Sequence, residues 1–200
     1  MKKFVCLILL FCLLSLTLSS CVNSADYLGV VENDDDTLIV WDGEAMYLSR
    51  VLIPSRINGN PVVAIDKAAF RKNKYVREIT IMSGPTVIGS DAFSGCTNLE
   101  KVILPDTLTE IGSGAFSNCH SLKEIKIPNG VRSIEKLTFY DCRSLERIDI
   151  PANMTHIAED AFGNCTNLKT IRFGGSEEEW KALVNPNSPD LINVSILFGK

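Results

Sequence analysis

Four cysteines recur at a fixed spacing, and their thiols are the first groups in this chain that could carry chemistry. They lie 23 residues apart, at Cys96, Cys119, Cys142 and Cys165. Four thiolates bind zinc when they converge as a tetrahedron. Two thiols form a disulfide when their Cα atoms come within about 7 Å. The choice between these depends on how the fold places residues that are 23 positions apart.

The apolar residues repeat with the same period. One column holds Phe70, Phe93, Phe116, Phe139 and Phe162, and a second holds Ile65, Ile88, Ile111, Ile134 and Ile157. A unit this short cannot bury its own apolar face, so units of this length stack and bury it together. The sequence therefore predicts a solenoid of about five to six coils.

The sequence predicts one short β-strand in each coil. Residues 99–104 read Leu-x-x-Val-x-Leu, which predicts a short strand at 101–104 that pairs in parallel with its equivalent one coil away. Proline ends the unit at Pro105, Pro128 and Pro151. Gly89 and Gly112 are expected to allow a tight corner on the return side of the coil.

Stacking decides between the cysteine chemistries. Coils about 4.8 Å apart place the four thiols in a line roughly 14 Å long, which cannot surround one zinc ion. A disulfide between adjacent coils is within Cα reach, but parallel side-chain vectors are unfavourable for it. We interpret the four cysteines as small buried side chains with a structural role, in a column where the first unit carries Asn73.

The whole unit, L-x-x-I-x-I-P-x-x-V-x-x-I-x-x-x-A-F-x-x-C-x-x, resembles the BspA-like leucine-rich repeats of bacterial surface proteins. The match runs from about Val51 to Phe173. The resemblance implies a repeat solenoid: a right-handed leucine-rich-repeat coil stack with short parallel β-strands, an N-terminal β-hairpin cap and a C-terminal helix-strand cap. It also implies adhesion or binding, although the family uses this scaffold for many partners.

The flanks fit terminal caps. Residues 27–50 contain two apolar runs around an acidic turn and predict the β-hairpin cap, and residues 51–173 hold the repeats. Residues 174–200 form the C-terminal cap, in which Ser176 and Glu179 make a capping box and 193–198 is a final strand. Trp180 is placed to cover the last coil.

The first residues predict export and lipid anchoring. Residues 1–20 have a basic start and an apolar stretch too short for a membrane span, as in a signal peptide. Small residues before Cys21 resemble the lipobox of bacterial lipoproteins, so 21–26 is interpreted as a lipidated cysteine and a short linker. An ordinary secretory signal is the alternative. The membrane, reached through the lipid, is thus an expected partner.

Charged residues on the strands alternate in sign from one coil to the next. One column reads Arg77, Glu100, Lys123, Glu146 and Lys169, and its neighbour reads Glu78, Lys101, Glu124, Arg147 and Thr170. Opposite charges on in-register strands stabilise a sheet by about 0.2–1 kcal/mol per pair. We interpret the pattern first as one that stabilises the register of neighbouring strands. It is also compatible with a polar recognition surface.

The sequence gives little support for metal binding, catalysis or nucleic-acid binding. The acidic turn at 32–36 could bind Ca²⁺ but lacks the glycine and distal glutamate of an EF-hand, so a solvated turn is favoured. His120 and His156 stand alone in their columns and are interpreted as surface residues. No catalytic motif is present. We therefore expect neither an enzyme nor a cofactor, and a net charge of −4 argues against a nucleic-acid partner.

These observations predict a lipid-anchored protein of the bacterial envelope, displayed on the outer surface, that binds a protein or glycan on another cell or host matrix. The alternative is a non-catalytic scaffolding lipoprotein of the periplasm. The candidate binding face consists of outward strand residues: Glu78, Thr80, Lys101, Ile103, Glu124, Lys126, Arg147, Asp149, Thr170 and Arg172.

Overall fold

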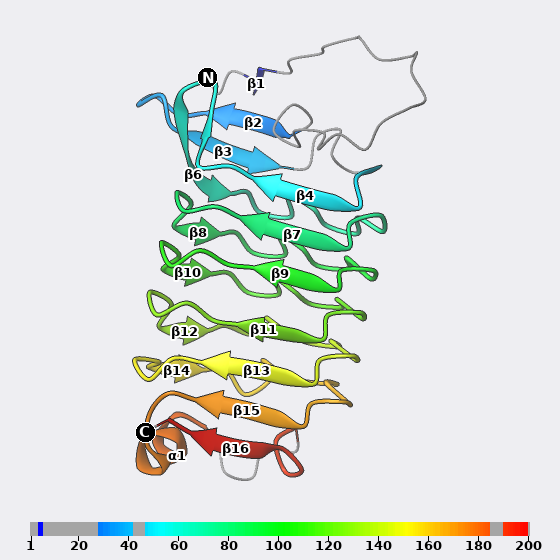
Figure 1. Ribbon diagram of the computed structural model, residues 1–200, viewed down its shortest axis with the longest axis vertical. Helices are drawn as coiled ribbons and strands as arrows, with labels where there is room; N and C mark the ends of the chain where they lie inside the picture. Colours follow the sequence, from blue (N-terminus) through cyan, green and yellow to red (C-terminus); the bar gives the residue numbers. More distant parts are fainter. Residues whose placement is uncertain (1–3, 6–27, 42–46, 185–189, 200) are drawn as a thin grey trace.

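The structure is a computed structural model that describes residues 4–5, 28–41, 47–184 and 190–199. The chain forms the expected solenoid, with parallel strands stacked along one long axis (Figure 1). Cys21 and the predicted linker lie outside the described residues, as does nearly all of the predicted signal peptide. Among the described residues, no helix is both long and apolar enough to cross a membrane.

Two strand ladders run the length of the stack. The front ladder contains β4 (Arg50–Ile53), β7 (Glu78–Ile81), β9 (Lys101–Ile103), β11 (Glu124–Lys126), β13 (Arg147–Ile150), β15 (Thr170–Phe173) and β16 (Ser195–Phe198). The back ladder contains β3 (Leu38–Trp41), β6 (Asn60–Ile65), β8 (Val87–Ile88), β10 (Glu110–Ile111), β12 (Ser133–Ile134) and β14 (His156–Ile157). The stack therefore has about seven turns. The expected five to six is too few because β4, at the start of the repeats, and β16, in the C-terminal cap, each add a strand to the front ladder.

The remaining elements lie at the two ends. At the N-terminal end, β2 (Gly29–Glu32) pairs antiparallel with β3 and with β1 (Phe4–Val5), and β5 (Arg56–Ile57) pairs antiparallel with β6. At the C-terminal end, α1 (Glu177–Leu183) begins with the predicted capping box of Ser176 and Glu179. Trp180 is buried, and its ring centroid lies 5.4 Å from that of Phe173 in the last repeat.

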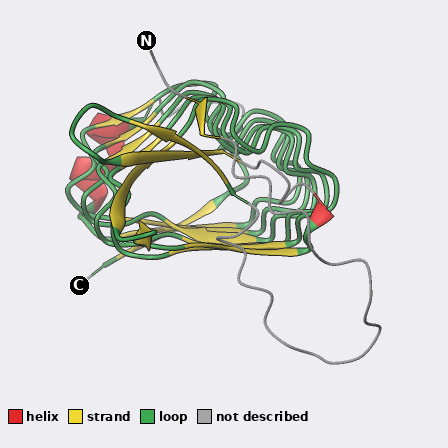
Figure 2. Ribbon diagram, turned by 90° about the horizontal axis from the view of Figure 1, so that it is seen from above, coloured by secondary structure: helices red, strands yellow, loops and turns green. Residues whose placement is uncertain are grey.

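A third side, which we call the turn edge, joins the back ladder to the front ladder. It consists of residues 68–73, 91–96, 114–119, 137–142 and 160–165. Successive coils follow the same path when viewed along the stack (Figure 2). The edge is held by main-chain bonds between coils, such as Phe93 N–H to Ala115 O (2.8 Å) and Phe116 N–H to Thr138 O (2.9 Å).

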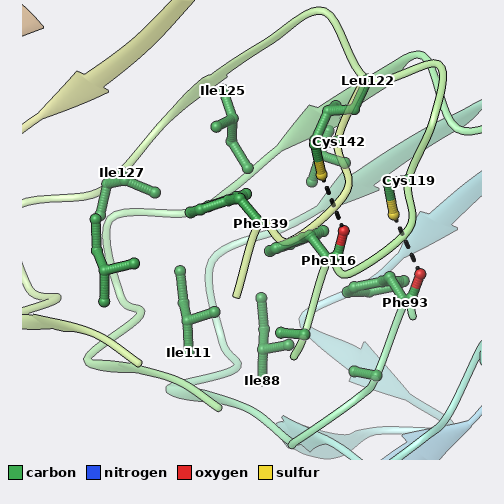
Figure 3. Close-up of a cluster of buried hydrophobic side chains, with 14 of the residues drawn as sticks. Ile88, Phe93, Ile111, Phe116, Cys119, Leu122, Ile125, Ile127, Phe139 and Cys142 are labelled. Atoms are coloured by element: carbon green, nitrogen blue, oxygen red, sulfur yellow. Dashed lines mark hydrogen bonds between the residues drawn. The ribbon is translucent and has the colours of Figure 1, made fainter. Parts of the chain in front are cut away.

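The core fills the space between the three sides. The five phenylalanines of the repeat column stack from Phe70 to Phe162, with centroids of neighbouring rings 5.3–5.8 Å apart. The isoleucines of the back ladder pack beneath them, as Figure 3 shows for Ile88 and Ile111. Residues 23 apart are therefore neighbours, as the sequence predicts.

Gly89 and Gly112 are needed for close packing between coils. Neither has a positive φ. A Cβ atom on Gly89 would lie 2.6 Å from the Lys67 nitrogen, and one on Gly112 would lie 2.5 Å from the Ser90 nitrogen. The expected reason, freedom to form a tight corner, is thus wrong for these two positions: the glycines leave room for the backbone of the preceding coil.

Candidate binding face

The outward side chains of the front ladder form the candidate binding face, and all ten residues predicted for it lie there. The strands alternate inward and outward residues, so that Ile79, Ile148 and Ile171 are fully buried while their neighbours are half-buried or exposed. Pairing is in register, with Glu78 beside Lys101 and Glu124 beside Arg147. Equivalent residues therefore form straight columns across the coils.

Ion pairs connect neighbouring coils in the predicted charge columns. The guanidinium of Arg77 lies 2.8 Å from the carboxylate of Glu100, and the ammonium of Lys169 lies 3.2 Å from that of Glu146. Arg147 pairs with Glu124 one coil back and lies 3.6 Å from Asp149 on its own strand. The alternating signs thus act between strands, as the columns predict.

The front ladder is interrupted once. The strands β4, β7 and β9 form one sheet, and β11, β13, β15 and β16 form another. In Figure 1, β9 and β11 lie visibly farther apart than their neighbours. Within the described part of the chain, no ion pair joins Glu100 to Lys123 or Lys101 to Glu124 across this gap, although their signs are opposite. We call the gap between β9 and β11 the seam.

The back ladder opens at the same level. β12 pairs with β14 but not with β10, so the seam separates both ladders between the same two coils. The turn edge continues across it through Phe116 N–H to Thr138 O and Asn118 N–H to Tyr140 O (2.7 Å). The two halves of the solenoid are thus joined at the seam mainly along one side.

Gly130 lacks a side-chain bond that neighbouring coils make, and it packs so closely on the preceding coil that a Cβ atom there would overlap Leu108 O. In the same column of neighbouring coils, the Thr107 hydroxyl donates to Pro85 O (2.9 Å) and the Asn153 amide donates to Asn129 O. Glycine has no side chain to make the equivalent bond. The main-chain N–H of Ile127 also points away from the seam and donates to Asp149 O (2.9 Å).

A surface groove of about 260 Å³ lies over the seam. Its lining comes from three consecutive coils: Lys101, Val102, Ile103, Leu104, Asp106, Glu124, Ile125, Lys126, Pro128, Arg147 and Asp149. Six of the ten predicted face residues line it. Glu78, Thr80, Thr170 and Arg172 lie on strands outside the groove.

The outward surface changes character at the seam. One column of outward residues begins with Leu52, Thr80 and Ile103. The side chains of Leu52 and Ile103 are 40% and 46% exposed. Beyond the seam the same column carries Lys126, Asp149 and Arg172. Leu52 was not predicted as a face residue. Leu52 lies one strand before Thr80 in the same column. Because the two residues are 28 positions apart instead of 23, the repeat period does not reveal this relation.

The four repeat cysteines are buried and unbridged. Each thiol donates a hydrogen bond to the phenylalanine carbonyl of the preceding coil, as Figure 3 shows for Cys119 to Phe93 O (3.2 Å) and Cys142 to Phe116 O (3.1 Å). Burial raises the pKa of both thiols well above its ordinary value, and burial raises the pKa of Cys165 to about 12. These thiols are protonated donors within the structure.

A polar cluster links the chain segments that lead from the turn edge into β11 and β13. The buried carboxylate of Asp141 accepts two hydrogen bonds from Arg143, both 3.0 Å, and lies 3.0 Å from Nε2 of His120 on the preceding coil. Hydrogen bonding by Arg143 lowers the pKa of Asp141. His120 lies at the surface, as expected, with its side chain 35% exposed and its ring hydrogen-bonded to Asp141. His156 is exposed on the back ladder.

The acidic turn at 32–36 organises the hairpin between β2 and β3. One oxygen of Asp35 accepts hydrogen bonds from the hydroxyl (2.6 Å) and the main-chain N–H (3.2 Å) of Thr37, and these bonds lower the pKa of Asp35. Across the residues that the structure describes, no group of three or more histidine, cysteine, aspartate or glutamate side chains could hold a metal ion.

Comparison with known proteins identifies the repeat. A family model described as the BspA type leucine rich repeat region matches residues 63–191 in six copies. No curated protein matches the chain.

Solved structures share the fold. A leucine rich cell surface protein from Faecalibacterium prausnitzii is 30% identical with a TM-score of 0.72, over 80% of this chain and 41% of that one. The leucine rich repeat protein of T. pallidum is 28% identical with a TM-score of 0.70, over 88% and 84%. The pneumococcal vaccine antigen PcpA, at 17% identity and a TM-score of 0.57 over 86% and 46%, shares the fold alone. The chain thus spans less than half of the Faecalibacterium protein.

Proposed function

Because the chain belongs to the BspA-type leucine-rich repeat family, we propose that it is a lipid-anchored binding protein of the bacterial cell surface. It holds a protein or glycan of another cell or of a host matrix against its front face. The observation that carries the proposal is this rigid exposed face, with outward columns that present apolar and charged groups across seven strands. Stacked coils hold such groups at fixed spacing, so many modest contacts act together.

Two further facts support the surface location. The 30% identical Faecalibacterium protein is itself described as a leucine rich cell surface protein. The sequence before the hairpin has the pattern of a lipoprotein signal that ends just before Cys21. The rival proposal places the same lipoprotein in the periplasm as a scaffold, without a ligand outside the cell.

Protease treatment of intact cells separates these proposals. Surface display predicts loss of the protein from intact cells, whereas a periplasmic protein is protected until the outer barrier is opened. A Cys21→Ser variant is the matched control, because it removes the lipid and leaves the solenoid unchanged. We expect this variant in the soluble fraction, and membrane association that persists would contradict the anchor.

A binding assay tests the role of the front face. The purified chain, immobilised through its N-terminus, is exposed to host-matrix proteins and to a glycan array. We compare wild type with Arg172→Glu, which alters the front face, and with Arg71→Glu, an exposed residue of the turn edge. Loss of retention only for the front-face variant supports the proposal. Equal retention by both variants would place binding elsewhere.

A further inference from the structure

We propose that the groove over the seam binds an extended peptide segment of a protein partner and takes up one of its apolar side chains. This proposal rests on the proposed function and narrows it, because it names both the part of the front face that binds and the kind of partner. Four independent features of the groove lead to it.

The floor of the groove is apolar and lies directly on the core. Inward residues of the front ladder are fully buried at Ile79 and Ile148, but Val102 and Ile125 at the seam are 8% and 4% exposed. Leu104 also lies in the groove and is only partly buried. Ile103, 46% exposed, adds an apolar side chain at the rim. An apolar group of a ligand therefore removes apolar surface of both molecules from water.

The strands beside the floor lack pairing toward each other. Among the described strands, β9 pairs only with β7 and β11 pairs only with β13, so the seam-facing main-chain groups of both strands are left outside the ladder. Unpaired strand edges are templates for an added chain. Recognition by strand addition uses such groups for affinity and uses side-chain pockets for specificity.

The volume of the groove favours one amino-acid side chain over a larger small molecule. At about 260 Å³ it is smaller than the roughly 300–1,000 Å³ of typical small-molecule sites. A single side chain with its adjoining backbone fits this space better than a cofactor does. No aromatic side chain lines the groove, so it offers no ring on which a sugar could stack.

The charges around the groove favour a partner of mixed sign. Lys101, Lys126 and Arg147 are positive. They alternate with three negative residues, Asp106, Glu124 and Asp149. This arrangement creates no net field that would attract a polyanion. It complements a segment in which residues of both signs flank the apolar one, because each ligand charge then meets an opposite charge in the rim.

Binding to synthetic peptides tests the proposal directly. The probe is an array of short peptides whose central residue is Leu, Phe or Ser and whose flanks combine Lys, Glu and Thr. The full chain in detergent should bind peptides with a central Leu or Phe and should not bind their Ser counterparts. Ile103→Glu should weaken this binding about tenfold or more, because it places a charge beside the apolar floor.

Leu52→Glu is the matched control. Leu52 occupies the same column and is 40% exposed, but it lies on β4, outside the groove. It should leave peptide binding unchanged, and thermal unfolding of both variants shows whether they fold. Equal effects of the two substitutions, or no discrimination between Leu and Ser peptides, would overturn the proposal.

Hydrogen exchange provides a second measurement without substitutions. In the free protein, the amides of residues 123–126 should exchange faster than those of 146–149, and a bound Leu peptide should slow only the first group. Equal exchange in the free protein would mean that β9 and β11 pair in solution, which contradicts the groove. A partner retained equally by wild type and Ile103→Glu would overturn this proposal and leave the proposed function intact.

Discussion

At the scale of single residues, the repeat thiols show why cysteine suits its column. Each sulfur fills a small buried space and donates to the phenylalanine carbonyl 26 residues earlier, so the thiol links two coils as well as packing between them. In the first unit Asn73 fills this column, and its side-chain oxygen instead accepts from the main chain of Tyr75 and Val76. The period predicts burial of the column, but the direction of these bonds depends on the turn geometry.

The raised thiol pKa values predict loss of stability at alkaline pH. A thiol whose pKa is higher in the folded than in the unfolded state stabilises the fold fully below the unfolded value of 9.0. That contribution is lost as the pH rises from about 9 toward the folded pKa, which is about 12 for Cys165. The free energy of unfolding should therefore fall steadily above pH 9, as measured by urea denaturation.

Cys142→Ala isolates the effect of one thiol. While the unfolded thiol is ionised and the folded one is not, each cysteine contributes about 1.4 kcal/mol per pH unit to the slope. The variant should lose stability less steeply with pH by roughly that amount. A slope identical to that of wild type would show that Cys142 titrates normally in the fold.

Asp141→Asn tests the polar cluster on the turn edge. Asn also tolerates the positive φ of 59° found at Asp141, so the backbone is unaffected. The lowered pKa of Asp141 means that its ionised form stabilises the fold above the ordinary value of 3.8 and that this effect is lost as the pH falls through the folded value. We expect a loss of about 1–2 kcal/mol at neutral pH. The difference from wild type should vanish in acid, and a difference that is independent of pH would contradict the charge-based explanation.

At the scale of elements, the charge columns contribute modestly to strand register. Arg147→Glu places like charges beside Glu124 and Asp149 and should lower the free energy of unfolding by about 0.5–1 kcal/mol. The loss should shrink in high salt, because exposed charges are screened. Lys136→Glu, on an exposed turn, is the control and should change stability less. Equal losses in low salt would argue that net charge matters and that the columns do not.

The sequence was sufficient to predict the front strands and their register, but neither the strands of the back ladder nor the seam. Periodic Phe and Ile residues define which positions face inward, because only one alignment of the coils buries them all. The segments Lys101–Ile103 and Glu124–Lys126 show equally good strand patterns, so nothing in them indicates that they do not pair. Gly130 stands where the two neighbouring coils have a bridging Thr or Asn, but Gly84 holds the same column beside paired strands, so a glycine there does not predict an open ladder.

At the scale of the whole molecule, the seam divides the ladders while the core remains continuous. The rings of Phe116 and Phe139 lie 5.7 Å apart on opposite sides of the seam and are nearly parallel. The turn edge joins the same coils through main-chain bonds. In a stack of this kind, cooperativity is transmitted through interfaces between neighbouring units. We therefore expect the two halves of wild type to unfold together despite the open ladders.

Removing the ring contact at the seam should uncouple the two halves. Phe116→Ala costs about 3–5 kcal/mol through the lost burial and the cavity, and it also removes the core contact that crosses the seam. Phe93→Ala is matched to it, because Phe93 is equally buried and stacks on both sides, but it leaves the contact between Phe116 and Phe139 in place.

Two probes of urea unfolding show whether the halves separate. With Trp41→Phe in all proteins, the fluorescence of Trp180 reports the C-terminal half and circular dichroism reports the whole chain. Both probes should give one midpoint in the Trp41→Phe parent and in its Phe93→Ala derivative, and two distinct midpoints in its Phe116→Ala derivative. A single midpoint for Phe116→Ala would mean that the turn edge alone keeps the solenoid cooperative. The seam would then be a local opening of the ladders and not a boundary between two units.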